Sequence, residues 1–237
     1  MVGTERETGS IAPTGIEPAS PEPMDSEPSV SARLYLVTPP ELELQSFPEH
    51  LDAALSAGDV AAVLIAGYPQ EHDMAPVAEA LVPLIQSHGA AALVENHSRI
   101  ASRCGADGVH VTGSYTDLTG MMERLKPDMI VGAGSVRTRH SAMQAGETGA
   151  DYVFFGKPHG DIRPEAHHKN LDLAEWWCDI VQVPAVVMAG SAIDSVKEVA
   201  ATRAEFIALH QACWAHPAGP ARAVTEALEL ILSERVD

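Results

Sequence analysis

Eight short apolar runs recur along the chain and constrain its fold more than any other feature. Within each run, apolar residues follow one another without alternating with polar ones. This pattern is typical of strands that are buried on both faces, as in a parallel sheet. The runs span Leu34–Val37, Ala61–Ile65, Ala91–Val94, Gly108–Val111, Met129–Gly132, Tyr152–Phe155, Ala185–Met188 and Phe206–Leu209.

Helix-length segments separate most of these runs. Apolar residues in the longer segments recur with a spacing of about 3.6, as on the buried face of an amphipathic helix. The expected helices are Met74–His88, the short link Ser98–Cys104, Leu118–Leu125, Thr138–Thr148 and Ala221–Leu232. Strand–helix units repeated eight times predict an α/β fold, the (β/α)8 TIM barrel. An open doubly wound sheet of eight strands is the alternative.

Residues 1–31 form a different kind of chain. Prolines alternate there with glutamates and aspartates, and few apolar side chains are present. Such a segment cannot bury enough apolar surface to offset the entropy lost on ordering. We therefore expect a disordered, acidic, Pro-rich tail at 1–31 and a single barrel domain at 32–237.

Composition limits the classes of partner and the location. The net charge of −18 disfavours nucleic acids and anionic membranes, which would meet like charge. No apolar stretch approaches the roughly 20 residues of a membrane-spanning helix, and no signal-peptide pattern opens the chain. We expect a cytoplasmic protein whose 3 cysteines stay reduced, whose core is aliphatic because aromatics make up only 5%, and which could form a homo-oligomer.

Polar residues follow the predicted strands directly, and in a barrel the carboxyl ends of the strands form the functional face. Glu95, Asn96 and His97 come immediately after the third run, and His110 lies just inside the end of the fourth. Gly134 and Ser135 follow the fifth run, and the sequence therefore predicts a polar site at this mouth.

The segment after the sixth run, "GKPHGDIRPEAHHKN", is unusually long and cationic. It holds Lys157, Arg163, Lys169 and three histidines against only two acids, in a strongly acidic chain. These features predict a lid that closes on phosphate or pyrophosphate. After the seventh run, Gly190 is expected at a helix start with Ser191 as its cap, where free amides would bind phosphate.

Several stretches together resemble the thiamine phosphate synthase family and its thiazole tautomerase relatives. They are "RLYLVT", "CGADGVHV", "VGAGSVRT", "TGADYVFFG" and "VPAVVMAGSAI", in family order between about Arg33 and Ile231. The resemblance implies a TIM barrel that joins a pyrimidine-methyl pyrophosphate to a thiazole phosphate. In that reaction Mg²⁺ and basic side chains help pyrophosphate to leave, and the thiazole nitrogen attacks the resulting cation.

The resemblance also assigns roles to residues of this chain. It implies Ser135 as a catalytic candidate and Glu95, Asn96 and Asp117 as candidate Mg²⁺ ligands. Lys157 of the cationic loop and His110, as an acid–base histidine, are the other catalytic candidates. The implied binding residues for a phosphorylated substrate are Lys157, His159, Lys169, Ala189, Gly190, Ser191 and His210. One departure is large, because the family's pyrophosphate-binding cations after the second strand are replaced by Leu64, Ala66 and Tyr68.

Three functions stay open on these grounds. The first is a divergent thiamine phosphate synthase. The second is a catalytically inactive paralogue that binds a phosphorylated thiazole-like ligand. The third is a tautomerase-type enzyme that transfers protons through His110 or His210.

Overall fold

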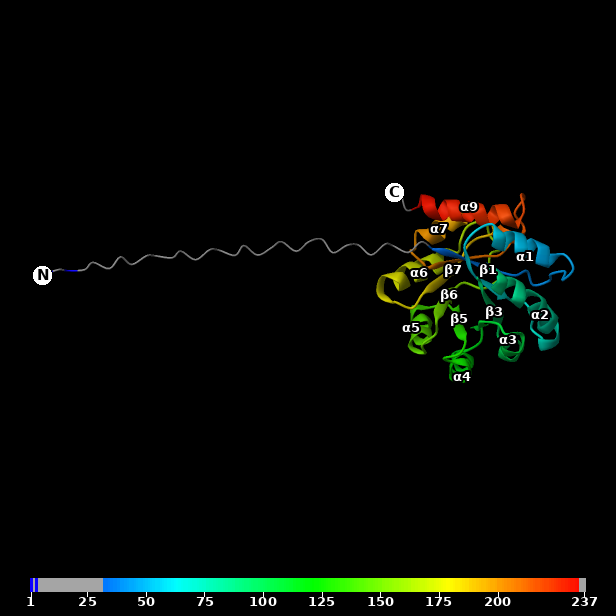
Figure 1. The fold of residues 1–237 in the computed structure, drawn as a ribbon, viewed down its shortest axis with the longest axis horizontal. Coiled ribbons are helices and arrows are strands. Elements are labelled where there is room, and N and C mark those ends of the chain that lie inside the picture. Colours follow the sequence, from blue (N-terminus) through cyan, green and yellow to red (C-terminus); the bar gives the residue numbers. More distant parts are fainter. Residues whose placement is uncertain (2, 4–31, 235–237) are drawn as a thin grey trace.

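The structure is a computed structural model that describes residues 1, 3 and 32–234, so the predicted tail lies almost wholly outside the described residues. Eight parallel strands form a closed barrel in chain order (Figure 1). Closure is direct, because β1 pairs with β8 through Leu34 and Ile207. The TIM barrel is confirmed and the open sheet is wrong. The strands are β1 (Arg33–Val37), β2 (Val60–Ile65), β3 (Ala91–Glu95), β4 (Gly108–Val111), β5 (Ile130–Val136), β6 (Tyr152–Phe155), β7 (Ala185–Met188) and β8 (Phe206–Leu209).

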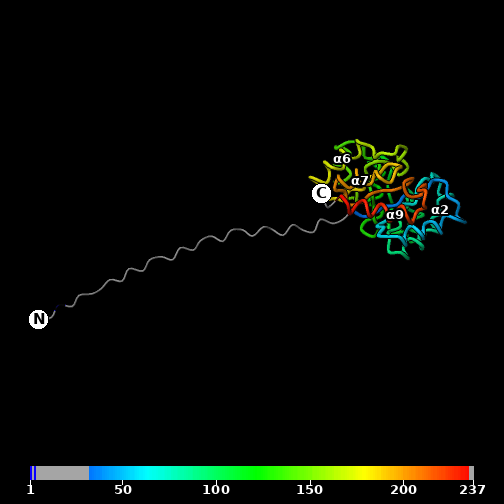
Figure 2. The backbone as a smooth tube through the Cα atoms, turned by 90° about the horizontal axis from the view of Figure 1, so that it is seen from above, coloured from blue at the N-terminus to red at the C-terminus, as the bar shows by residue number. Residues whose placement is uncertain are grey.

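Helices surround the barrel, and α9 lies across its outside against α1 and α7 (Figure 2). Among the described residues, none of these helices is long and apolar enough to cross a membrane. The helices are α1 (Phe47–Ser56), α2 (Glu71–Ser87), α3 (Ser98–Cys104), α4 (Tyr115–Leu125), α5 (Arg139–Glu147), α6 (His168–Ile180), α7 (Ser195–Ala200), α8 (Gln211–Trp214) and α9 (Pro220–Ser233).

A repeated acidic residue accepts backbone hydrogen bonds at the amino-terminal ends of the barrel strands. Asp107, Asp151 and Glu205 each stand just before a strand, in the related stretches "GADG", "GADY" and "RAEF". Their carboxylates accept the backbone N–H of Ala92, Val131 and Ala185, respectively, at 2.7 Å in each case. Each of these amides belongs to the start of the preceding strand, where the ladder leaves a donor unpaired. The repeat therefore has a structural role.

The barrel interior holds a few aromatic rings among aliphatic side chains, and the layer between sheet and helices is mostly aliphatic. Inside, the ring of Tyr35 packs edge-on against Tyr152 and Phe154, with centroids 5.9 and 5.8 Å away. Space for these rings comes from glycines on β5, since a Cβ at Gly132 would lie 2.0 Å from the Tyr152 ring. Most of the core is aliphatic as predicted, and a few large rings fill part of the volume inside the barrel.

Candidate functional site at the barrel mouth

Glu95 ties together the tops of three neighbouring strands. Its Oε2 accepts the N–H of Gly67, 2.9 Å away, just after β2. Its Oε1 accepts the hydroxyl of Thr112 at the end of β4, at 3.2 Å. Each carboxylate oxygen keeps further lone pairs for a ligand, so Glu95 is placed to hold a cation at the mouth.

Asn96 uses its amide to bind the next strand. Its Nδ2 donates to Thr112 Oγ1 at 2.7 Å, and its Oδ1 accepts the Thr112 N–H at 2.8 Å. The backbone of Asn96 has a φ of 58°, and Ser135 on β5 has a φ of 57°. Ser135 also reaches Thr112, donating its hydroxyl to the carbonyl oxygen. Left-handed conformations at non-glycine residues cost energy and cluster at functional sites, which supports both residues as site candidates.

Asp117 is held apart from this group by the start of α4. Its Oδ2 accepts both the N–H and the hydroxyl of Ser114, at 2.7 Å each, in a capping box. These hydrogen bonds from Ser114 lower the pKa of Asp117. Among the described residues, no three His, Cys, Asp or Glu side chains gather into a metal site. Of the three candidate ligands, Glu95 and Asn96 lie in one hydrogen-bonded group around Thr112, whereas Asp117 bonds to Ser114.

His110 lies beneath the mouth, in the closed interior, with no exposed surface. Its Nδ1 pairs with the hydroxyl of Tyr152 at 3.0 Å, and that hydroxyl pairs with Tyr35 at 3.0 Å. Burial lowers the pKa of His110 to about 3, so the imidazole is neutral at neutral pH. Its buried Nε2 has no hydrogen-bond partner among the described residues, and it faces Gly134.

The loop between β6 and α6, residues 156–167, crosses the other side of the mouth. Asp161 of this loop is buried, and its Oδ1 accepts His210 Nδ1 at 2.9 Å. Its Oδ2 accepts the N–H of Gln211 at 2.6 Å. The ring of His159 stands edge-on to His210 with centroids 4.8 Å apart, and His159 Nε2 donates to the Thr38 carbonyl at 2.9 Å. In the sequence, Asp161 is one of two acids in a basic loop, and nothing in the local pattern indicates a partner 49 residues away.

The amides after β7, predicted as a phosphate site, are bonded within the chain. Gly190 N–H donates to Ser195 Oγ at 2.9 Å, and Ser191 N–H donates to the Arg163 carbonyl at 2.7 Å. Ala189 N–H belongs to the pairing with β8, donating to the Ala208 carbonyl at 3.0 Å. The expected helix start is wrong by several residues, since α7 begins at Ser195 and Ser191 does not cap it.

A cavity of about 560 Å³ opens between the top of β5 and the β6–α6 loop. Lys157, His159 and Lys169 line it, as do Ser135 and Arg137. The structure thus brings Lys157 and Lys169 together with the predicted serine of β5, whereas Arg163 lines a different cavity. Ala189, Ser191 and His210 do not line this cavity.

Comparisons with known proteins agree with this architecture. The sequence pattern of the thiamine monophosphate synthase family matches residues 34–213. A thiamine-phosphate synthase of Rhodospirillum centenum is 38% identical over 198 residues, covering 82% of this chain and 95% of its own. One from Hyphomonas neptunium is 34% identical over 206 residues, covering 84% and 93%, respectively.

A solved structure has the same fold. The thiamine phosphate pyrophosphorylase of Pyrococcus furiosus superposes with a TM-score of 0.68 over 87% of this chain and 98% of its own, at 22% identity. With the family match over most of the barrel and relatives above 30% identity, the assignment is direct. The chain belongs to the thiamine monophosphate synthase family.

Proposed function

We propose that this protein is a thiamine phosphate synthase, joining a hydroxymethylpyrimidine pyrophosphate to a thiazole phosphate with release of pyrophosphate. Membership of the family and the activity named for its relatives support the proposal. The observation in the structure that carries it is that a carboxylate, Glu95, and a cavity lined by cations lie at the same mouth of the barrel. Loss of pyrophosphate from a carbon requires positive charge near the departing oxygens.

The side chains at the mouth have separable tasks in this reaction. Lys157 and Lys169 stabilise the negative charge that collects on the departing pyrophosphate as its C–O bond breaks. Ser135 lies on the cavity wall, and its hydroxyl, which donates to the Thr112 carbonyl, can accept a hydrogen bond from a substrate donor. The thiazole nitrogen then supplies the electron pair for the new C–N bond.

Mg²⁺ is a proposed cofactor, and Glu95 is its best-placed ligand. Mg²⁺ is commonly bound by one or two carboxylates, with substrate phosphates and water completing its shell. Glu95 and Asn96 would supply a carboxylate and an amide oxygen, and the ion would neutralise charge on the leaving group. Asp117 already accepts two hydrogen bonds from Ser114 through Oδ2, and we assign it no part in the bound state.

A proton-transfer function is the second candidate, favoured by the Asp161–His210 pair. A buried carboxylate on Nδ1 fixes the orientation of the His210 ring and leaves Nε2 for acid–base chemistry. In that case the barrel mouth would isomerise a phosphorylated thiazole at His210 and form no new C–N bond.

The test is turnover of both synthase substrates with Mg²⁺, measured as thiamine phosphate and pyrophosphate. The proposal expects both products in equal amounts. Thiazole phosphate binding without either product contradicts the synthase, and proton exchange of the bound thiazole would then identify the second candidate. The predicted cytoplasmic location and homo-oligomer stay predictions.

A further inference from the structure

Thr112, at the end of β4, bonds to three candidate site residues on the neighbouring strands. Its hydroxyl contacts Glu95 and Asn96 at the end of β3, and its backbone bonds to Asn96 and to Ser135 of β5. Asn96 and Ser135 also hold left-handed backbone conformations, with φ of 58° and 57°. Strain of this kind persists only where surrounding contacts hold it, and here such contacts converge on Thr112.

The direction of each hydrogen bond around the Thr112 side chain is fixed by chemistry. The backbone N–H of Thr112 can only donate, so the Asn96 atom that lies 2.8 Å from it is Oδ1. Asn96 Nδ2 then faces Thr112 Oγ1, 2.7 Å away, and can only donate to it. The single proton of the Thr112 hydroxyl is left for Glu95 Oε1, at 3.2 Å, which as a carboxylate oxygen accepts it. Thr112 is therefore a donor to Glu95.

The carboxylate of Glu95 is consequently held from two sides. Thr112 donates to Oε1 from β4, and the N–H of Gly67 donates to Oε2 from the end of β2, at 2.9 Å. Donors on two different strands restrict the rotation of the carboxylate, while each oxygen keeps further lone pairs for a ligand. A side chain that is already held in this way loses less conformational entropy when it binds an ion.

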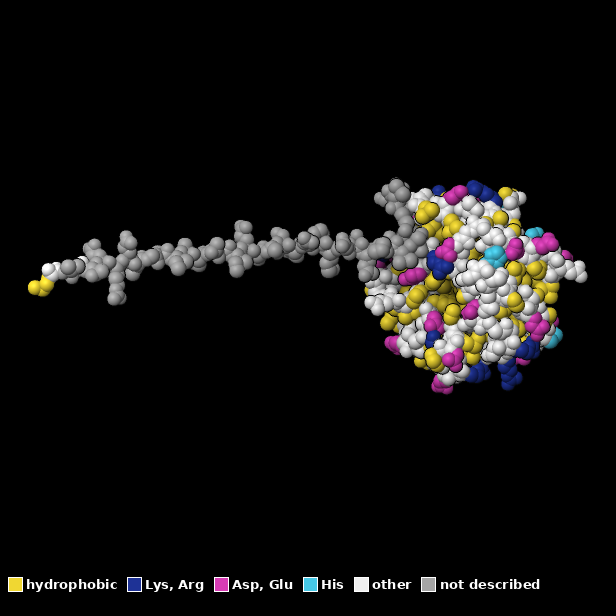
Figure 3. Space-filling model, in the orientation of Figure 1, with side chains coloured by type: hydrophobic (Ala, Val, Ile, Leu, Met, Phe, Trp, Pro, Cys, Tyr) yellow, Lys and Arg dark blue, Asp and Glu magenta, His cyan; other side chains and the backbone are white. Residues whose placement is uncertain are grey.

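Orientation, and not charge alone, distinguishes Glu95 as a ligand for a cation. The chain has 33 acidic residues, and on the face drawn in Figure 3 side chains of both charges are scattered and do not gather in one patch. Mg²⁺ demands near-ideal octahedral geometry and is bound through one or two carboxylates. Removal of a partner that orients such a ligand lowers metal affinity by roughly 10- to 100-fold. Thr112 is such a partner for Glu95.

We propose that Thr112 is a positioning residue, whose hydroxyl holds the Glu95 carboxylate, together with the N–H of Gly67, in the orientation that binds a divalent cation. The use of that cation in turnover rests on the proposed function, but the orientation of Glu95 rests on the hydrogen bonds alone.

Hydrogen exchange of the full chain without metal is the first test. Thr112→Val removes the hydroxyl and keeps the shape of the side chain, so Glu95 loses the donor to Oε1 and is free to turn away from Gly67. The Gly67 amide should then exchange about tenfold faster, as expected when one hydrogen bond is lost. Thr112→Ser keeps the hydroxyl and should exchange at the rate of the parent chain.

Two references separate this local effect from a loss of the fold. The N–H of Ala92 is bonded to Asp107 at the other end of β3, and its exchange should be the same in all variants. Thr119→Val on α4 is the matched control, because its hydroxyl donates to the Thr116 carbonyl and not to Glu95. Exchange at Gly67 should be unchanged in this control.

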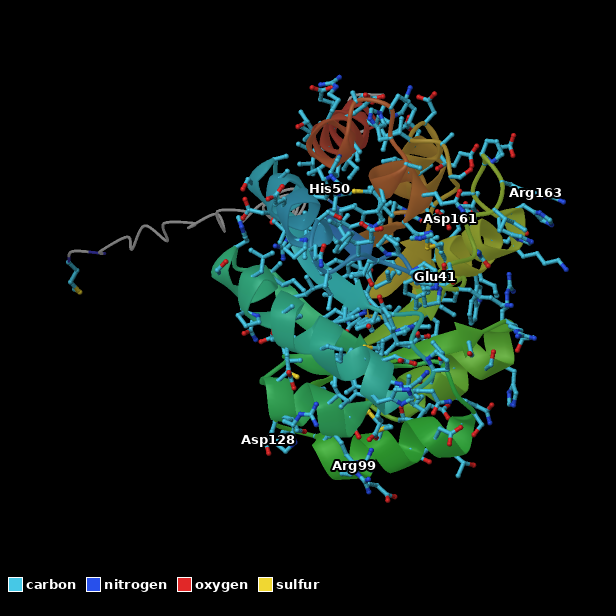
Figure 4. All side chains as sticks on the ribbon, turned by 90° about the vertical axis from the view of Figure 1, so that its right-hand side faces the viewer. Glu41, His50, Arg99, Asp128, Asp161 and Arg163 are labelled. Carbon is cyan, nitrogen blue, oxygen red and sulfur yellow. The ribbon has the colours of Figure 1, made fainter. Side chains whose placement is uncertain are left out.

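The Mg²⁺ dependence of turnover is the second test. In Thr112→Val the Mg²⁺ concentration that gives half of the maximal rate should rise about tenfold, and Thr112→Ser should restore it. Asp128→Asn removes a surface carboxylate just before β5, at the opposite end of the barrel, and should leave this concentration unchanged. Figure 4 places Asp128 far from Asp161 of the mouth.

Either of two results would overturn the proposal. One is unchanged exchange at Gly67 in Thr112→Val, and the other is an Mg²⁺ dependence of Thr112→Val equal to that of the parent chain. If Thr112→Val does not fold, Thr112→Ala takes its place in both comparisons. Absence of turnover in every chain, with faster exchange at Gly67 in Thr112→Val, contradicts the proposed function but supports the positioning of Glu95 by Thr112.

Discussion

The two sides of the barrel mouth are built in different ways. On the β3–β5 side, Glu95, Asn96 and Ser135 meet around Thr112 through side chains that stand within two residues of a strand end. On the β6–β8 side, a long loop supplies backbone carbonyls and the buried Asp161 to groups far away in sequence. The first side leaves polar groups available to a ligand. On the second side the backbone N–H groups after β7 and β8 are satisfied within the chain, whereas Lys157 and Lys169 line the cavity. Function therefore cannot be read from strand ends alone.

The largest expected effect comes from replacing Glu95 on the β3–β5 side of the mouth. Glu95→Gln should lower Mg²⁺-dependent turnover at least ~100-fold, because it removes the charge best placed to hold the ion. Steady-state formation of thiamine phosphate measures this, with Glu79→Gln, an exposed glutamate on α2, as the control. Turnover that survives in Glu95→Gln would mean that the metal is held elsewhere or is not needed.

Removing the buried acid tests the second side. Asp161→Ala should destabilise the fold by about 2–3 kcal/mol, since it leaves Gln211 N–H and His210 Nδ1 without acceptors. Urea unfolding monitored by circular dichroism gives the change. Asp161→Asn keeps one oxygen acceptor and should lose less. Equal stability of the alanine variant and the parent chain would show that the loop does not hold Asp161 in place.

The buried His110 beneath the β3–β5 side should make the free energy of unfolding depend on pH. Burial lowers the pKa of His110 to about 3, whereas an unfolded histidine titrates near 6.5. Below pH 6.5 His110 binds a proton in the unfolded chain but not in the folded chain. The free energy of unfolding therefore decreases as the pH falls toward 3. Between pH 7 and pH 5 this amounts to about 2 kcal/mol.

Comparing the parent chain with His110→Gln isolates this contribution, since the other titrating groups are common to both. The stability difference between pH 7 and pH 5, from urea unfolding, should be smaller in the variant by that amount. An unchanged difference would mean that His110 is protonated in the folded protein.

The smallest expected effect comes from a substitution where the β6–α6 loop contacts the turn after β7. Gly190→Ala should cost about 1–2 kcal/mol and free the loop, because its Cβ would overlap the Pro164 carbonyl. Hydrogen exchange at Ser191 and Ala192 should then accelerate, since their acceptors lie on that loop. Gly120→Ala on α4 is the control, as nothing lies within 4 Å of its Cβ position. Undisturbed exchange in Gly190→Ala would show that the loop is not docked there.

Apolar periodicity misplaced the start of α4, which a capping residue decides. Apolar periodicity indicated a helix from Leu118, but α4 begins at Tyr115 because Ser114 and Asp117 form a capping box. The signal, a serine followed three residues later by an acid, is present in the sequence. By contrast, no short-range signal relates Ser191 to Arg163 or His210 to Asp161, since those contacts join separate strand–helix units.

The sequence by itself determined the strands, their parallel order and the residues at their carboxyl ends. Local periodicity and turn chemistry depend on neighbours within a few residues, and β4, β6, β7 and β8 match their predicted bounds. Only the tertiary structure decided which polar groups satisfy one another and which stay available to a ligand. Asp161 shows the reason, because a buried carboxylate takes whichever donors the folded barrel places beside it.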